Sequence, residues 1–132
     1  MTDRDLILVV DDEPMIVDLL RTYLTGLGYR VAAAGNGAEA LGHVSVTRPD
    51  AVVLDLQLPD MSGAEILGRL RAIDDSIPVL LLTANTDEVV ARGLLKAGAL
   101  DYICKPVRLE VLEVAVTTAV SVGRRPGSAP AV

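Results

Sequence analysis

The stretch Ala51-Val-Val-Leu-Asp55-Leu-Gln-Leu-Pro59-Asp-Met-Ser-Gly63 decides how this chain folds. Its first four residues are apolar, which is typical of a strand buried on both faces. Asp55 stands where that strand ends, and Pro59 prevents a regular strand or helix from following directly. In open α/β sheets ligands bind at this edge, outside the carboxyl ends of the strands. We therefore interpret Asp55 as a candidate functional carboxylate; the alternative is that it only caps the loop.

Length and composition indicate one domain with an aliphatic core. The chain has 132 residues, 51% of them hydrophobic, and three tyrosines are its only aromatic residues. Its 18 acidic and 12 basic residues give a net charge of −6, which disfavours direct nucleic-acid binding. One cysteine excludes an intramolecular disulfide. With no apolar run near the roughly 20 residues of a membrane span, and an acidic start unlike a signal peptide, we predict a cytoplasmic protein without membrane contact.

Outward from the central strand, the pattern alternates strand and helix five times. The expected strands are 6–10, 30–34, 51–54, 79–82 and 101–104, and the expected helices are 14–27, 38–46, 64–73, 87–97 and 109–122. The apolar stripe of the first helix comprises Ile16, Leu19, Leu20, Tyr23, Leu24 and Leu27. Residues 1–122 are expected to form the domain, and the Gly- and Pro-rich residues 123–132 a linker or disordered tail.

Five strand–helix units predict a parallel sheet with helices on both faces. All strand carboxyl ends then share one edge. The residues that follow the strands, and so converge there, are Asp11, Asp12, Asp55, Thr83 and Lys105.

This set of side chains suits phosphoryl chemistry with a divalent cation. Two carboxylates about 4.5 Å apart repel each other by about 3–4 kcal/mol at an effective dielectric near 20. An all-oxygen site that relieves this repulsion favours Mg²⁺. Lys105 supplies a compact positive charge and Thr83 a hydroxyl, both suited to phosphoryl oxygens. Asp55 is then the plausible nucleophile, giving an acyl phosphate.

Each of these residues also has an ordinary structural explanation. Asp11 and Asp12 would be favourable at a helix N-terminus by their charge alone. Thr83 would serve as the N-cap of the fourth helix. Lys105 would be a solvated lysine and Tyr102 a half-buried strand residue. The functional interpretation depends on all of them meeting at one edge.

Taken together, the motifs resemble the receiver domain of two-component response regulators. They are Asp11-Asp12, the stretch Val52 to Gly63, Thr83-Ala84, and Lys96-Ala-Gly-Ala-Leu-Asp-Tyr-Ile-Cys-Lys-Pro106. The match covers about residues 5–122. It implies a flavodoxin-like, doubly wound five-stranded parallel sheet in the order 2-1-3-4-5 with five helices. The chain departs from the family pattern at Leu100 and Val107, near the surface where outputs differ.

The resemblance implies a phosphoacceptor signalling domain rather than an enzyme, one that assists its own phosphorylation and dephosphorylation. Asp55 would receive the phosphoryl group from a sensor histidine kinase or a phosphotransfer protein. The implied Mg²⁺ ligands are Asp12, Asp55 and the backbone carbonyl of Gln57, with Asp11 acting through water.

The same resemblance implies a switch. Lys105 would contact the phosphoryl group, Thr83 would move toward it, and Tyr102 would swing inward behind. Because Lys105 must point back over the site directly after a strand, we also predict a cis Lys105–Pro106 peptide bond.

Two other classes remain as alternatives. A Mg²⁺-dependent phosphohydrolase with an aspartyl nucleophile places Asp after a buried strand, but wants a second acid two residues later, where this chain has Gln57. A flavodoxin wants a phosphate loop after the first strand, where Asp11 and Asp12 would repel phosphate. Turnover of a phosphate ester or a yellow colour would distinguish them.

The last helix suggests an output surface. Leu112, Ala115, Val116 and Ala119 can face the sheet, while Val111, Val114 and Val122 widen the apolar stripe beyond about 100°. We expect the fourth helix, fifth strand and fifth helix to contact a second copy or an effector domain. The alternative is a helix that is simply well buried.

Overall fold

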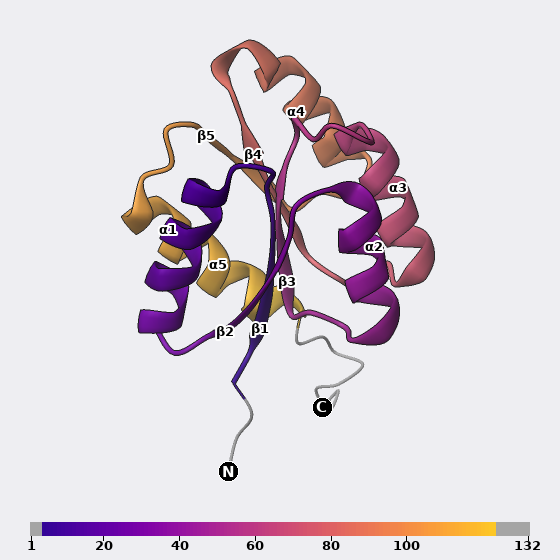
Figure 1. Cartoon of the computed structure of the whole chain (residues 1–132). Coiled ribbons are helices and arrows are strands. Elements are labelled where there is room, and N and C mark those ends of the chain that lie inside the picture. The colour runs from indigo at the N-terminus through magenta and orange to yellow at the C-terminus, as the bar shows by residue number, and fades with distance from the viewer. Residues whose placement is uncertain (1–3, 124–132) are drawn as a thin grey trace.

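The computed structural model describes residues 4–123 as alternating strands and helices around one sheet (Figure 1). The strands are β1 (Leu6–Val10), β2 (Arg30–Ala34), β3 (Ala51–Asp55), β4 (Val79–Thr83) and β5 (Asp101–Cys104). The helices are α1 (Pro14–Gly26), α2 (Gly37–Val46), α3 (Gly63–Ile73), α4 (Glu88–Lys96) and α5 (Leu109–Gly123), and a 3₁₀ turn, Asn85–Asp87, precedes α4. Every predicted element is present, with ends that differ by one residue at most.

The sheet is fully parallel and has the order β2-β1-β3-β4-β5, as predicted. Its register aligns the carboxyl ends of neighbouring strands: Val10 pairs with both Ala34 and Leu54, and Thr83 pairs with Cys104. Strands β3 and β4 are buried along their whole length, because helices cover both faces of the sheet. Side chains that follow these strands therefore emerge at one common edge.

Helices lie on both faces of the sheet (Figure 1), and an apolar layer holds them to it on each face. One layer joins the sheet to α1 and α5, and the other joins it to α2, α3 and α4. Alternate residues of each buried strand serve the two layers, so that Val53 packs with α1 and α5 while Leu54 packs with the other three helices. Aliphatic side chains dominate both layers, in keeping with a chain that has no Phe or Trp.

Part of the predicted stripe of α1 is wrong. Leu20 and Leu24, one turn apart, are fully buried, but Leu19 is 45% exposed and Leu27 is 40% exposed. The helix ends at Gly26, so Leu27 already belongs to the turn, where Gly28 adopts a φ of +103°. Leu20 and Leu24 are the fully buried part of the stripe, Ile16 and Tyr23 pack against the same layer, and Leu19 lies beside them.

Among the described residues, none of the helices has the length and apolarity to cross a bilayer. Gly123, predicted to begin a linker, is instead the last residue of α5. The predicted tail at 124–132 lies outside the described residues.

Candidate functional site

The backbone hydrogen bonds between neighbouring strands continue one residue beyond β1, β3 and β5. They fix the first residue of the loop that follows each of these strands. The Asp11 amide donates to Ala34 O at 3.1 Å, and the Leu56 amide donates to Leu82 O at 3.1 Å. The Lys105 amide donates to Thr83 O at 2.7 Å. These bonds place the polar residues of four different βα units along one edge of the sheet.

The three aspartates predicted to meet do so. Asp11, Asp12 and Asp55 each offer a carboxylate oxygen, and these oxygens lie within 4.8 Å of one another. Asp11 and Asp55 are buried, whereas Asp12 is exposed to solvent. A donor set of carboxylate oxygens that is open on one side suits Mg²⁺, which keeps several water ligands.

Asp11 shows the electrostatic strain of this cluster. Its Oδ1 accepts the Glu13 amide at 2.9 Å, but its Oδ2 is buried without a hydrogen-bond partner. Burial raises the pKa of Asp11 from 3.8 to about 6, the charge of Asp55 adds to the rise, and the Glu13 amide and Lys105 oppose it. An orphaned, buried carboxylate oxygen fits a site whose charge is completed by a cation.

Lys105 is the cation that the chain itself supplies. Its Nζ lies 3.2 Å from Asp55 Oδ1, 3.8 Å from Asp11 Oδ2 and 4.0 Å from Glu13 Oε1. Only the Asp55 contact is within hydrogen-bonding distance, so this lysine is directed chiefly at Asp55. The peptide bond to Pro106 is cis, which confirms the prediction.

Thr83 and Tyr102 lie on neighbouring strands behind this cluster. Thr83 is buried, and its hydroxyl donates to Ala84 O at 3.0 Å. It caps no helix, because Ala84 and Asp87 occupy the N-cap positions of the turn and of α4. Tyr102 is half-buried, and its hydroxyl donates to Glu88 Oε2 at 2.8 Å. That bond raises the pKa of Tyr102 above its usual value.

The loop after β3 folds tightly over Asp55. The Gln57 amide donates to Asp55 Oδ1 at 3.1 Å, and Gln57 forms an antiparallel bridge with Ser62. A Cβ on Gly63 would collide with the Leu56 side chain, so glycine permits this close return of the chain.

Sequence reasoning did not find two further contributors to this edge. The Asp60 carboxylate accepts the Gly37 and Ala38 amides at 2.9 and 3.0 Å, which ties the β3–α3 loop to the start of α2 and lowers the pKa of Asp60. The Gln57 side-chain amide donates to Asp87 Oδ2 at 2.7 Å. Both contacts join different βα units, and no local pattern signals them.

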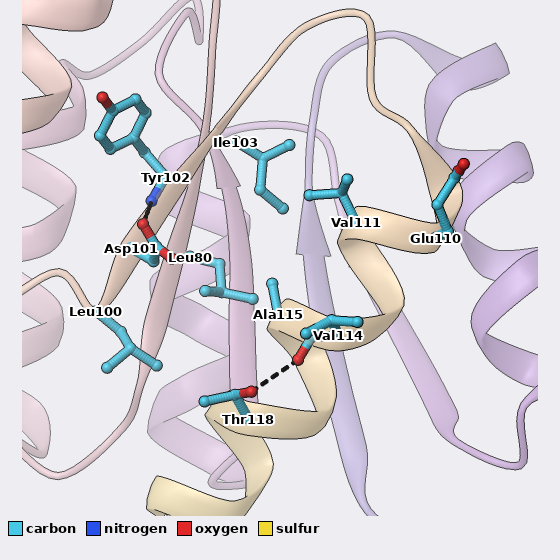
Figure 2. A pocket seen from close by; sticks show the side chains of 10 residues that line it. All are labelled: Leu80, Leu100, Asp101, Tyr102, Ile103, Glu110, Val111, Val114, Ala115 and Thr118. Atoms are coloured by element: carbon cyan, nitrogen blue, oxygen red, sulfur yellow. Dashed lines mark hydrogen bonds between the residues drawn. The ribbon is translucent and has the colours of Figure 1, made fainter.

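A groove of about 480 Å³ lies between β5 and α5, away from Asp55 (Figure 2). Val111 and Val114 line it together with Leu100, and Asp101 and Glu110 add acidic groups. Val114 is 67% exposed, so α5 is not the well-buried helix of the alternative interpretation. The Tyr102 ring points away from α5, toward the layer of α4.

Comparison with known proteins gives a consistent result. The family model described as the response regulator receiver domain matches residues 7–117. The DNA-binding response regulator MtrA of Mycolicibacterium smegmatis is 45% identical over 107 residues, which are 81% of this chain and 46% of that protein. The transcriptional regulatory protein KdpE of Mycobacterium tuberculosis is 48% identical over 105 residues, 80% of this chain and 46% of that protein. The chain thus spans about half the length of these relatives.

Solved structures agree with the sequence relatives. A response regulator receiver domain protein from Clostridium thermocellum superposes with a TM-score of 0.85 at 31% identity, covering 89% of this chain and 94% of that one. A CheY-like receiver domain protein from Methanospirillum hungatei gives a TM-score of 0.87 at 27% identity, covering 92% and 98%.

Proposed function

The chain belongs to the response regulator receiver family, and we propose that Asp55 is the residue on which it accepts a phosphoryl group. The observation that carries this proposal is the contact of Lys105 Nζ with Asp55 Oδ1 at 3.2 Å, beside the Asp11 and Asp12 carboxylates. Of the three acids, only Asp55 combines burial with that direct lysine contact. As a receiver domain of two-component response regulators, the chain is a signalling module.

The donor is the phosphohistidine of a sensor histidine kinase or phosphotransfer protein. A carboxylate oxygen of Asp55 attacks phosphorus, the P–N bond breaks, and the imidazole leaves with its electron pair and takes up a proton. Lys105 stabilises the oxygens that carry the charge in the transition state. Hydrolysis of the resulting acyl phosphate returns the carboxylate and inorganic phosphate.

Mg²⁺ bound at this edge would neutralise the charge of the acidic cluster and of the incoming phosphoryl group. Asp12, Asp55 and the Gln57 backbone carbonyl would hold it, with Asp11 acting through water. The orphaned Oδ2 of Asp11 and the grouping of carboxylate oxygens within 4.8 Å support this assignment.

The switch uses Thr83 and Tyr102. A phosphoryl group on Asp55 offers an acceptor to the Thr83 hydroxyl, which now bonds only its neighbour Ala84. Movement of Thr83 toward the phosphoryl group frees space behind it for the Tyr102 ring, which packs on the same side of the sheet as α4.

A phosphohydrolase is less well supported. Two residues after the nucleophile such enzymes want an acid, and here the Gln57 side-chain amide is engaged with Asp87 at 2.7 Å. We therefore propose that the chain catalyses no turnover of an external substrate and only assists its own phosphorylation and dephosphorylation. We propose that the chain is located in the cytoplasm, where the histidine kinase would phosphorylate it.

The output partner contacts α4, β5 and α5. Exposed Val111 and Val114 beside the groove of Figure 2 supply apolar contact area. We propose that a second copy of the chain or an effector domain covers this face, and that nucleic acid does not bind the chain directly, since its net charge is −6.

The phosphoacceptor is tested by intact mass. Incubation with acetyl phosphate and Mg²⁺ should add one phosphoryl group to the wild type and none to Asp55→Asn. Asp75→Asn, at an exposed acid of the loop before β4, is the matched control and should be modified like the wild type. Modification of Asp55→Asn at the wild-type level would refute the assignment.

A further inference from the structure

We propose that two consecutive acids, Asp87 and Glu88, form a single tether that positions both Gln57 over the phosphorylation site and Tyr102 against α4, so that release of one contact loosens the other. Asp87 ends the 3₁₀ turn and Glu88 begins α4. Their role in the phosphorylation-dependent switch rests on the proposed function, whereas the tether itself does not.

The first contact of the tether reaches the site. The Gln57 amide group donates to Asp87 Oδ2 at 2.7 Å across 30 residues of sequence. Gln57 is two residues from Asp55 and gives its backbone amide to Asp55 Oδ1 at 3.1 Å. Asp87 therefore holds the Gln57 side chain, while the Gln57 backbone is bonded to Asp55, the proposed phosphoacceptor.

The second contact reaches the tyrosine. The Tyr102 hydroxyl donates to Glu88 Oε2 at 2.8 Å, which holds the end of the ring at the first turn of α4. A hydrogen bond to an ionised carboxylate is stronger than one between neutral groups. The Tyr102 ring therefore cannot change its orientation unless Glu88 moves or this hydrogen bond breaks.

The two acids move together because they are consecutive residues at the junction of the 3₁₀ turn and α4. Ala84 O accepts the Asp87 amide at 2.9 Å and also the Thr83 hydroxyl at 3.0 Å. If Thr83 turns toward a phosphoryl group, Ala84 O loses one of its two donors. The junction of the 3₁₀ turn and α4 can then shift. The Gln57–Asp87 and Tyr102–Glu88 hydrogen bonds change together, because both acids lie at this junction.

It follows that the tether favours the unphosphorylated arrangement. Its two contacts are made in the arrangement in which the Thr83 hydroxyl bonds Ala84 O, so their removal lowers the free energy required for Thr83 to turn toward a phosphoryl group. Because the Gln57–Asp87 contact is exposed to solvent and the Tyr102–Glu88 contact is only partly buried, the loss of one of them corresponds to a shift of about 2- to 10-fold in a two-state equilibrium.

The first experiment needs no phosphoryl group. The chain has three tyrosines, so 3-fluorotyrosine labelling gives one ¹⁹F signal each, assigned by Tyr→Phe variants. Gln57→Ala and Asp87→Ala should both move the Tyr102 signal, although neither residue bonds to that ring. Tyr23 and Tyr29 pack in the layer of α1 and α5 and serve as internal controls. Asp87→Asn keeps an acceptor and should retain the wild-type signal.

A double-variant comparison shows whether the effect travels through the tether. In the Glu88→Ala background, Gln57→Ala should cause no further movement of the Tyr102 signal. A Tyr102 signal that does not respond to Gln57→Ala overturns the proposal. So does a response of equal size with and without Glu88, because the path would then bypass the tether.

The second experiment measures switching. Half-maximal response of the Tyr102 signal should need about 2- to 10-fold less beryllofluoride in Asp87→Ala or Glu88→Ala than in the wild type. Asp75→Ala is the matched control and should match the wild type. An unchanged or raised midpoint in both tether variants overturns the proposed bias. A wild type that neither responds to beryllofluoride nor is modified by acetyl phosphate would instead refute the proposed function, and the first experiment would still stand.

Discussion

Replacing Asp11 with asparagine should stabilise the metal-free protein near pH 7.5. Burial raises the pKa of Asp11 to about 6 from 3.8, so the folded chain holds an ionised carboxylate at a cost of about 3 kcal/mol. Asparagine keeps an oxygen for the Glu13 amide, now 2.9 Å from Oδ1, and removes the charge. For 132 residues, 1 kcal/mol corresponds to about 3–4 °C, so the melting temperature should rise by up to about 10 °C.

The pH dependence has a definite sign. Between about pH 4 and pH 6 the folded Asp11 keeps a proton that the unfolded chain has already lost. The contribution of Asp11 therefore favours folding at the acidic end and is lost as the pH rises through about 6. Asp11→Asn should lack this loss, so the difference in stability between variant and wild type should grow from about pH 4 and level off above about pH 7.

Mg²⁺ should stabilise the wild type more than Asp11→Asn. In the wild type a cation relieves the repulsion within the Asp11, Asp12 and Asp55 cluster, so saturating Mg²⁺ should raise the melting temperature. In Asp11→Asn the repulsion is already reduced and the rise should be smaller.

The assay is thermal unfolding followed by circular dichroism at several pH values, with EDTA or Mg²⁺. Asp75→Asn, which removes an exposed acid elsewhere, controls for net charge and should change the melting temperature little. If Asp11→Asn melts at or below the wild type without metal at pH 7.5, burial of that charge is not costly and the reasoning fails.

Three further outcomes are expected. Glu88→Gln should lower the pKa of Tyr102 toward its ordinary value near 10, because the carboxylate that holds the phenolic proton is gone. A pH titration of the non-fluorinated Tyr102 ring followed by ¹³C NMR would show it, and an unchanged pKa would contradict the hydrogen bond. Leu70→Ala should cost about 2–5 kcal/mol in urea unfolding, since Leu70 is fully buried in the core between α3 and the sheet, and a cost near zero would place it outside that core. Beryllofluoride should promote self-association of the wild type but not of Val114→Glu in analytical sedimentation; a monomer in both states would leave an effector domain as the partner of this face.

The sequence by itself determined the order of strands and helices and the composition of the site. Apolar runs such as Val79–Leu82 could be recognised locally, because a strand buried on both faces shows no polar alternation. Once the units alternate, parallel pairing brings Asp11, Asp55 and Lys105 to the same edge, whatever the details of packing. The convergence of the polar residues therefore needed no knowledge of side-chain contacts.

Only the tertiary structure decided which of two adjacent, chemically similar residues is buried and which is exposed. Asp11 is buried with an orphaned oxygen while Asp12 beside it is exposed, because the amide of Asp11 still extends the ladder to β2. Leu20 faces the sheet while Leu19 lies to one side, since the position of the sheet under α1 selects one line of the apolar stripe.

Contacts between loops could likewise not be predicted from the sequence. Gln57 and Asp87 belong to different βα units, and Asp60 meets the start of α2 from the loop after β3. Such pairs have no periodic spacing, because their meeting depends on how far each loop extends above the shared edge. Local patterns determine which residues reach that edge, and the three-dimensional placement of the units determines which of them bond to one another.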